Sequence, residues 1–347
     1  VINEYTACRE KAVLIDLSSL RKFEILGPDA EELMDYTLTR NVKKLSVGQI
    51  VYSSMCYENG SMFDDGTLLK MSDHGFRWVC GDEYAGEWLK EQAKKKKFNV
   101  LVKNSTDQIN NISLQGPNSR KILEKFIFTP PTQPSISELQ WFRFTICRVK
   151  ELSGIPLMVS RTGYTGELGY EIWCHPSDAP AVWDVLMEAG KDEGLIPAGF
   201  GALDLLRIEA GLILFGNEFD GQVDPFEAGV GFTVPLKTKT ADFIGKEALI
   251  KRKENPQKKL VGLELVGKEK ANHGDCVHIG RSQVGVVTSG CLSPALNKNI
   301  ALCRIDVGHS EIGINVEVGK IDGHQKRIPA KVVGFPHYDP QKTRVKS

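Results

Sequence analysis

The chain has 347 residues, of which 41% are hydrophobic and 25% charged, enough apolar sequence for two or three folded domains. Lys plus Arg and Asp plus Glu each number 44, so no net charge would attract nucleic acid or an anionic membrane, and a small partner is expected. No apolar run reaches the roughly 18 to 20 residues that cross a bilayer, no signal peptide follows Val1, and eight scattered cysteines form no CxxC pair. We expect a cytoplasmic protein, or one of the mitochondrial matrix if eukaryotic, with free thiols and no metal.

Two segments follow the same pattern of an alternating strand, a Gly-Pro turn and a helix. The first runs from Phe23 to Leu38 and the second from Ile112 to Phe126. The Gly-Pro pair ends each strand, and Asp29 or Asn118 is placed to cap the helix that follows. The repeat predicts two related α+β units in tandem.

An acidic pair lies in the first of these units. A turn at Asn59-Gly60 leads to Asp64 and Asp65, just before the strand-like residues 67–69. Neighbouring residues on a strand point to opposite faces, so one of the two carboxylates is expected to enter a shared pocket. A turn cap or a surface pair is the alternative interpretation.

A glycine-rich segment from Gly163 to Glu171 is the most unusual stretch. Three glycines recur at a spacing of three, and the segment presents two tyrosines and two carboxylates. The pattern is G-x-x-G-x-x-G, unlike the G-x-G-x-x-G of dinucleotide-binding folds, and it runs into the strand-like residues 170–173. A plain β-hairpin turn and a close approach of the backbone to a ligand both fit it.

Apolar residues at helical spacing predict two helices in the second half, at 178–190 and at 200–215, the latter ending near Gly216. Arg207 falls inside the apolar part of the later helix, where an unpaired guanidinium would be costly to bury. Its partner is expected to be Glu209, another carboxylate of the protein, or an anionic ligand.

The pattern changes after a further helix at 245–253 and a charged linker at 251–259. Residues 260–333 contain short alternating runs separated by Gly- and Asn-containing turns, which is typical of a small β-barrel or sandwich. We therefore predict three domains: a first α+β unit at 1–110, a second at 111–255 that interleaves with the first, and a C-terminal β-barrel at 256–347.

Seven short motifs, taken in order, resemble the T-protein (aminomethyltransferase) of the glycine cleavage system and its superfamily, which includes tetrahydrofolate-dependent demethylases. The likeness extends from about residue 9 to about residue 338. It implies a cloverleaf of two related α+β domains and a β-barrel around a central folate channel. The motifs are Asp64-Asp65, Leu114 to Asn118, Gly163 to Glu171, Leu206 to Gly211, Phe215 to Asn217, Phe243 to Leu249 and Thr288 to Pro294.

The resemblance also implies roles for individual residues. Asp65 corresponds to the family's essential carboxylate, which orients the folate and assists proton transfer, and Asp64 is the second choice for that role. Glu171 would accept hydrogen bonds from the amino group and ring N–H of the pterin. Folate contacts are further implied for Tyr52, Tyr164, Arg207, near the p-aminobenzoyl-glutamate part, and Tyr338.

Three departures from the family pattern bear on the identity of the donor substrate more than on the binding of folate. Ala202-Leu203-Asp204 stands where Ala-Arg-Asp is usual, and Gly81 stands where an asparagine near the folate is usual. The N-terminal Gly-Trp segment that shapes the substrate entrance is absent before Val1.

The resemblance implies three possible functions. The favoured one is aminomethyl transfer to tetrahydrofolate from a lipoyl carrier protein like the H-protein. The alternative is a tetrahydrofolate-dependent demethylase of a small methylated donor, such as dimethylsulfoniopropionate or a methylated amine. The third is a non-enzymatic folate-binding protein, but such proteins carry Lys-Gly-Cys where this chain has Gly245-Lys246-Glu247.

Overall fold

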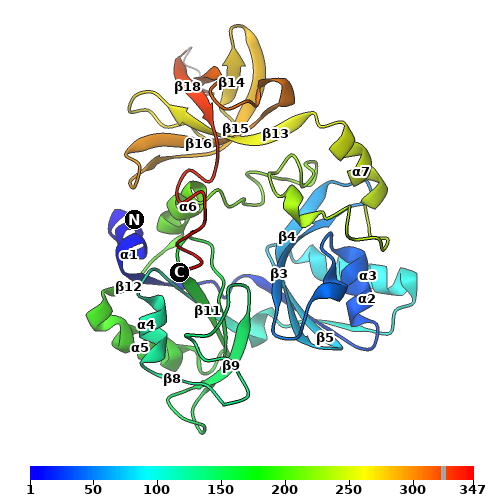
Figure 1. Ribbon diagram of the computed structural model, residues 1–347, viewed down its shortest axis with the longest axis vertical. Helices are drawn as coiled ribbons and strands as arrows, with labels where there is room; N and C mark the ends of the chain where they lie inside the picture. The colour runs from blue at the N-terminus through cyan, green and yellow to red at the C-terminus, as the bar shows by residue number, and fades with distance from the viewer. Residues whose placement is uncertain (322–325) are drawn as a thin grey trace.

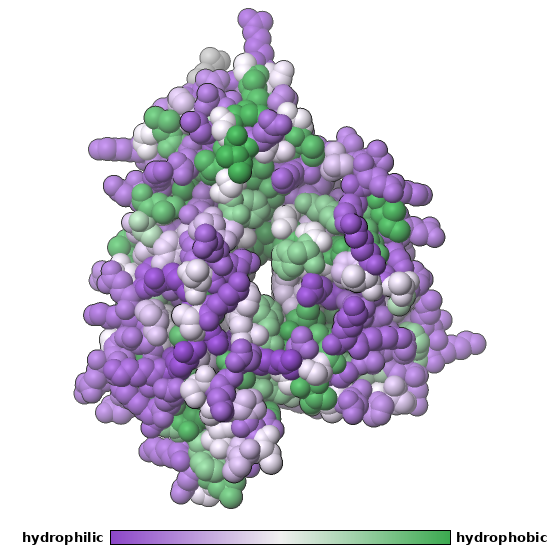
Figure 2. All heavy atoms as spheres, in the orientation of Figure 1, coloured by the Kyte–Doolittle hydropathy of each residue, from purple (hydrophilic) through white to green (hydrophobic). Residues whose placement is uncertain are grey.

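The computed structural model describes residues 1–321 and 326–347, which fold into three lobes (Figure 1). The lobes are built on a five-stranded sheet, a seven-stranded sheet and a closed β-barrel. The space-filling view shows an opening between them in the middle of the molecule (Figure 2). The predicted α+β cloverleaf with a C-terminal barrel is therefore confirmed.

The five-stranded lobe is antiparallel throughout, in the strand order β3-β4-β5-β2-β6. Buried side chains of the sheet, such as Phe23 and Trp78, pack with Leu33 and Leu89 of two helices into one core. The elements are β2 (Arg21–Leu26), α2 (Ala30–Thr37), β3 (Ile50–Cys56), β4 (Met62–Ser72), β5 (Gly75–Cys80), α3 (Tyr84–Lys96) and β6 (Leu101–Asn104).

The seven-stranded lobe has the strand order β12-β1-β7-β11-β10-β9-β8 and is antiparallel except for the pair β1–β12. The chain leaves this lobe after Asp16 and returns to it at Asn110. The domain boundaries at residues 110 and 255 stay a prediction. The elements are α1 (Ile2–Glu10), β1 (Ala12–Asp16), β7 (Asn110–Gln115), α4 (Ser119–Glu124), β8 (Ile127–Phe128), β9 (Phe144–Val149), β10 (Pro156–Ser160), β11 (Gly169–Cys174), α5 (Ala179–Gly190), β12 (Leu195–Pro197) and α6 (Phe200–Glu209).

The predicted repeat is present as β2–α2 and β7–α4, with the same turn in both. Gly27 and Gly116 have φ of +135° and +125°, and an added Cβ would lie 2.5 Å and 2.6 Å from a backbone carbonyl oxygen. Only glycine fits such a turn without strain. The predicted caps are wrong: neither Asp29 nor Asn118 makes a side-chain cap hydrogen bond. Both hold neighbouring backbone instead, because Asp29 accepts from Asn99 N and Asn118 donates to Glu193 O.

The helix predicted at 200–215 is shorter than expected. It ends at Glu209 because Gly211 adopts a left-handed φ of +63°, so the chain turns before it reaches Gly216. The charged linker is shorter too, since α7 (Lys246–Glu254) and the first barrel strand leave only residues 255–257 between them.

The closed barrel runs in the order β13-β16-β15-β14-β17-β18 and confirms the predicted β-rich end of the chain. Beyond it, the C-terminal tail returns to the seven-stranded lobe and ends there (Figure 1). Arg161 and Arg120 fix the tail by donating to the Ser347 carbonyl oxygen. The strands are β13 (Lys258–Leu265), β14 (Cys276–Ile279), β15 (Ser282–Ser293), β16 (Lys298–Asp306), β17 (Asn315–Gly319) and β18 (Arg327–Val333).

Three observations bear on the class of protein. None of the helices in the described ranges is both long and apolar enough to span a membrane. The eight cysteines are all free. Within residues 1–321 and 326–347, no group of three or more His, Cys, Asp or Glu side chains is arranged to hold a metal ion.

Candidate active site

The acidic pair lies on β4, and its two side chains have different surroundings. Asp64 is 1% exposed and accepts from the backbone N–H groups of Asp65, at 2.9 Å, and Asp82, at 3.4 Å. Asp65 is half-buried and accepts from the hydroxyl of Tyr52, with 2.6 Å between Tyr52 Oη and Asp65 Oδ2. As expected for neighbours on a strand, the two carboxylates do not share their partners.

Burial sets the protonation of this pair. It raises the pKa of Asp65 to about 6, although the hydrogen bond from Tyr52 works in the opposite direction. Burial, and then the charge of Asp65, raise the pKa of Asp64 to about 8. Burial and the proximity of the two carboxyls therefore favour a single negative charge on the pair, a situation typical of acid–base sites.

Tyr52, the hydrogen-bond partner of Asp65, lies beside another aromatic ring. The rings of Tyr52 and the largely exposed Phe232 have their centroids 6.1 Å apart. Tyr164 donates its hydroxyl hydrogen to the Ile213 carbonyl oxygen. Burial raises the pKa of Tyr164, the charge of Arg207 opposes this, and the charge of Asp65 adds to it.

Arg207 is buried in α6 and paired within the protein. Its guanidinium donates to Glu218 at 2.9 Å, to Asp204 at 2.8 Å and to Ser289 at 2.8 Å. Glu218 is 0% exposed and also accepts from Thr288, Ser289 and the Leu214 N–H, so both of its oxygens are used. The expectation of a protein carboxylate is correct, but the carboxylates are Glu218 and Asp204 and not Glu209. A contact of Arg207 with the folate stays a prediction.

The three glycines of the 163–171 segment make room for other side chains. A Cβ at Gly163 or Gly169 would lie 2.0 Å from Gln115 Oε1, and one at Gly166 would lie 2.8 Å from the Cβ of Ala210. Gln115 is fully buried and bridges the loop, because it donates to the Thr162 carbonyl oxygen and accepts from Thr165 Oγ1. The segment is a hairpin loop between β10 and β11 that is packed around one amide.

Glu171 is at the start of β11, at the end of this loop. Thr162 Oγ1 donates to its Oε2, and Asn111 Nδ2 donates to its Oε1 at 3.2 Å. Each carboxylate oxygen keeps a lone pair for a further donor, and Glu171 remains half-buried rather than sealed. Asn111 Oδ1, next to it, is buried and has no hydrogen-bond partner among residues 1–321 and 326–347. The neighbourhood of Glu171 therefore has an excess of acceptors and fits a ligand edge rich in N–H groups.

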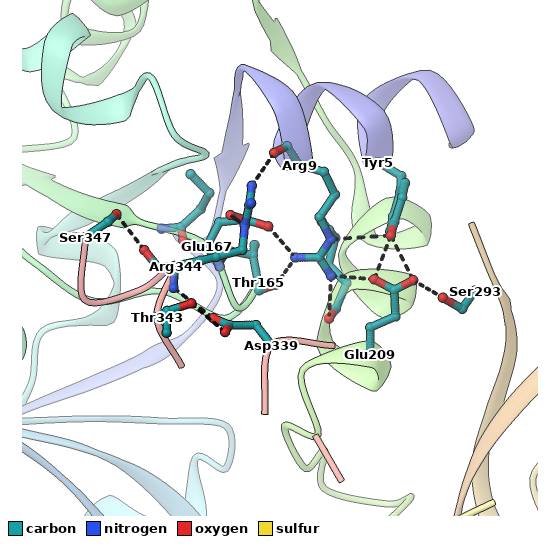
Figure 3. A network of polar contacts seen from close by, with 12 residues as sticks. Tyr5, Arg9, Thr165, Glu167, Glu209, Ser293, Asp339, Thr343, Arg344 and Ser347 are labelled. Carbon is teal, nitrogen blue, oxygen red and sulfur yellow. Dashed lines mark hydrogen bonds and ion pairs between the residues drawn. The ribbon is translucent and has the colours of Figure 1, made fainter. Parts of the chain in front are cut away.

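The second carboxylate of the segment belongs to a separate network, shown in Figure 3. Arg9 of α1 pairs with Glu167 at 2.9 Å and with Glu209 at 2.5 Å, and Arg344 of the C-terminal tail pairs with Glu167 at 2.6 Å. The Tyr338 ring lies 4.0 Å from the Arg9 guanidinium carbon. The structure therefore groups Tyr338 with Arg9 and does not bring it into contact with Asp65 or Tyr52.

Of the candidate residues, Tyr52 and Asp65 are joined by a hydrogen bond and Asp64 precedes Asp65 on β4, whereas Tyr164 and Arg207 are held by other partners. Glu171 is on the seven-stranded lobe, whereas Asp65 is on the five-stranded lobe; β3 and β11 border opposite sides of the central opening (Figures 1 and 2). Sequence reasoning missed Glu218, although it directly follows the motif Phe215 to Asn217. It also missed Thr162, Asn111 and Arg9, which have no distinctive local pattern.

Three lobes around an opening, with the acidic pair on one lobe and Glu171 on another, form the three-domain cloverleaf architecture (Figures 1 and 2). Comparisons with known proteins give the family. Residues 1–238 match the model of the GCVT N-terminal domain, and residues 258–339 match that of the glycine cleavage T-protein C-terminal barrel domain. The chain belongs to the glycine cleavage T-protein family.

Two curated relatives and one solved structure are similar to the chain. A trimethylamine-oxide aldolase of Ruegeria pomeroyi is 58% identical over all of this chain, which spans only 44% of that protein. An aminomethyltransferase of Symbiobacterium thermophilum is 40% identical over 97% of this chain and 89% of its own length. The glycine cleavage system aminomethyltransferase T of Bartonella henselae superposes with a TM-score of 0.85 at 26% identity, covering 97% of this chain and 89% of that one.

Proposed function

We propose that this chain transfers a one-carbon unit at the oxidation level of formaldehyde to tetrahydrofolate, and that the N-oxide of a methylated amine is the source of the carbon. Every carbon of trimethylamine oxide belongs to a methyl group, so the aldehyde that an aldolase releases from it is formaldehyde, together with dimethylamine. An aminomethyl group carries its carbon at the same oxidation level. Both relatives therefore agree on the unit to be transferred and differ only in the donor.

The observation that carries the proposal is the arrangement of the acidic pair on β4: Asp65 is half-buried and held by the Tyr52 hydroxyl, whereas Asp64 is buried beside it. Two amine nitrogens of tetrahydrofolate bond to the carbon of formaldehyde, and the formaldehyde oxygen leaves as water together with the two N–H hydrogens. Asp65, which is held by the Tyr52 hydroxyl, is the proposed acceptor of the proton that the attacking nitrogen loses. Burial favours the protonated form of Asp64, so the pair carries one negative charge.

Glu171 is the proposed contact of the pterin ring. Its two oxygens can accept from the ring N–H and the amino group in parallel, the geometry in which a carboxylate binds two adjacent donors. Tyr52 and Tyr164 are proposed to line the path between Glu171 and Asp65. Contacts of Arg207 and Tyr338 with the far end of the folate belong to the same proposal.

We assign only the capture of the one-carbon unit to this chain. The aldolase named above is more than twice as long as the matched part, so cleavage of the donor is left out of the proposal. Aminomethyl transfer from a lipoyl carrier protein is the second candidate, because the similarity to the aminomethyltransferase covers 89% of that enzyme.

The test is calorimetric titration with tetrahydrofolate, followed by measurement of the rate at which formaldehyde is incorporated into tetrahydrofolate. The rate of the spontaneous reaction is subtracted. We expect binding in the wild type, its loss in Glu171→Ala, and a rate that falls to background in Asp65→Asn. The donor screen then includes trimethylamine oxide, dimethylsulfoniopropionate and an aminomethylated lipoyl carrier protein. Turnover with the carrier protein alone would favour the second candidate, and a wild type that does not bind tetrahydrofolate would overturn both.

A further inference from the structure

Behind Glu171 a chain of hydrogen bonds runs through three residues that the proposed function does not use. Trp173 Nε1 lies 3.0 Å from Ser160 Oγ, and Ser160 Oγ lies 2.9 Å from Thr162 Oγ1. Thr162 Oγ1 in turn donates to Glu171 Oε2. Ser160 is fully buried and Thr162 nearly so, which means that water does not compete for these hydroxyl groups.

The direction of this chain follows from its first member. An indole N–H can only donate, so Ser160 Oγ accepts from Trp173. The hydroxyl hydrogen of Ser160 then has two possible acceptors, Thr162 Oγ1 at 2.9 Å and the Glu171 carbonyl oxygen at 3.5 Å, and the shorter contact is the stronger. Thr162 accepts from Ser160 and has its own hydrogen left for Glu171. All three groups therefore donate toward the carboxylate.

The opposite direction is unfavourable. A protonated Glu171 that donated to Thr162 would turn the Thr162 hydrogen toward Ser160 Oγ, which already accepts from Trp173. The Ser160 hydrogen would be left with the 3.5 Å contact to the Glu171 carbonyl oxygen. Asn111 Nδ2 also favours an ionised Glu171, because it donates to the other carboxylate oxygen at 3.2 Å.

The charged groups around Glu171 come from the neighbouring lobe and the connection to it. Lys22 of β2 is fully buried, and its Nζ donates to the carbonyl oxygens of Ser18, at 2.8 Å, and Leu20, at 2.9 Å. Burial raises the pKa of Glu171, while the hydrogen bonds from Thr162 and Asn111 and the charge of Lys22 oppose this. Burial lowers the pKa of Lys22 itself and the charge of Arg77 adds to this, whereas the charges of Asp16 and Asp107 oppose it.

We propose that Thr162, held by Ser160 and Trp173, is a positioning residue that keeps the Glu171 carboxylate a pure acceptor, so that the site selects a ligand edge with two adjacent N–H donors. The inference rests on the proposed function, in which the pterin ring of tetrahydrofolate presents that edge. A protonated Glu171 would set an O–H against one of the ligand's N–H groups and lose one of the two hydrogen bonds.

The experiment compares Thr162→Val, which removes the hydroxyl at nearly constant volume, with Thr162→Ser, which keeps it. Thr37→Val is the matched control: Thr37 is 2% exposed, lies in α2 away from the site, and donates to the Leu33 carbonyl oxygen. The dissociation constant for tetrahydrofolate is measured by calorimetry between pH 5.5 and 8.5.

We expect Thr162→Val to weaken binding about tenfold at pH 7, because a hydrogen bond to a charged group is lost. Without that bond the pKa of Glu171 rises, so binding should begin to fail at a higher pH than in the wild type. Thr162→Ser and Thr37→Val should keep the wild-type profile. Trp173→Phe frees the Ser160 hydroxyl and should give a smaller shift in the same direction.

The outcomes separate this inference from the function on which it rests. If Glu171→Ala abolishes binding while Thr162→Val keeps both the wild-type affinity and pH profile, the positioning role is wrong and the folate site stands. If the wild type does not bind tetrahydrofolate, the function is wrong, and the carboxyl pKa of Glu171 is followed by ¹³C NMR in both proteins. An unchanged value in Thr162→Val would then overturn the positioning role as well.

Discussion

At the scale of single residues, Asp65 is the carboxylate whose loss should affect the reaction most directly. Asp65→Asn removes the proton acceptor but keeps the shape of the side chain and its contact with Tyr52. We expect the rate of one-carbon transfer to fall about 10²- to 10⁴-fold, the range for a positioned acid–base group, with little change in the affinity for tetrahydrofolate. A tenfold or smaller loss in a steady-state assay would remove Asp65 from the catalytic role.

Tyr52 changes the pKa of the Asp65 carboxyl, which gives a prediction about the pH dependence of the activity. The activity should rise with pH through about 6 as Asp65 ionises. The hydrogen bond from Tyr52 lowers the pKa of Asp65, so Tyr52→Phe should move this acid limb to higher pH. The measurement is the transfer rate between pH 5 and 8; an acid limb at the same pH in both proteins contradicts the assignment.

Asp64 gives a prediction about stability. Its pKa is about 8 in the folded protein, above its ordinary value of 3.8, so folding favours the protonated form. The stability that this contributes is complete below about pH 4 and is lost as the pH rises toward 8. Asparagine does not titrate. The free energy of unfolding of Asp64→Asn, taken relative to that of the wild type, should therefore increase by about 2 to 3 kcal/mol as the pH rises from 5.5 to 8.5. Urea denaturation at the two pH values measures the gain, and a constant difference would show that Asp64 is ionised throughout.

At the scale of elements, the hairpin loop between β10 and β11 depends on the fit of Gln115 between two glycines. Gly169→Ala would place a Cβ 2.0 Å from Gln115 Oε1, so we expect a loss of about 1 to 3 kcal/mol in the free energy of unfolding. Gln115→Ala alone should also destabilise, because the bridge from Thr162 to Thr165 is lost.

The double variant tests that fit. If the clash is with Gln115, Gly169→Ala together with Gln115→Ala should be less destabilised than the sum of the single variants by about 1 kcal/mol or more. Denaturant unfolding of the four proteins measures the coupling. Strict additivity would mean that the cost of Gly169→Ala does not come from a clash with Gln115.

The elements also show what could be predicted from the sequence. The two Gly-Pro turns indicated the repeat because their signal is local: the backbone at Gly27 and Gly116 excludes other residues. The caps at Asp29 and Asn118 could not be predicted, since both side chains are used by segments distant in sequence. The end of α6 was misplaced because Gly211 and Gly216 both have a positive φ, and the pattern does not say which of them ends the helix.

In the candidate site too, residues in local motifs could be predicted from the sequence, whereas contacts between distant segments could not. Asp65 and Glu171 were found because they stand in ordered motifs that resemble a known family. Glu218 was not found as the partner of Arg207, because the two lie on different segments and meet only where α6 contacts the barrel. Thr162 acts on Glu171 through a hairpin register that no periodicity indicates.

At the scale of the whole molecule, buried cations hold the lobes around the opening. Lys239 is fully buried and donates to the carbonyl oxygens of Asp35, Leu38 and Arg40, which joins the segment after α6 to the five-stranded lobe. The Arg9 network joins α1 and α6 to the barrel through Ser293, which donates to Glu209 at 2.5 Å, and to the C-terminal tail through Arg344 (Figure 3). The relative position of the lobes therefore depends on a few desolvated charges.

Arg9 is the test of this dependence. Its side chain is 6% exposed between Glu167 and Glu209, which are 1% and 0% exposed. Arg9→Met keeps the apolar length of the side chain and leaves two buried carboxylates without their shared cation, so we expect a loss of about 3 to 5 kcal/mol in the free energy of unfolding. Arg344→Met is the control, because Arg344 is 37% exposed and Glu167 keeps Arg9; about 1 kcal/mol or less is expected. Equal losses in the two variants would mean that the tail, and not the buried arginine, holds the barrel to the seven-stranded lobe.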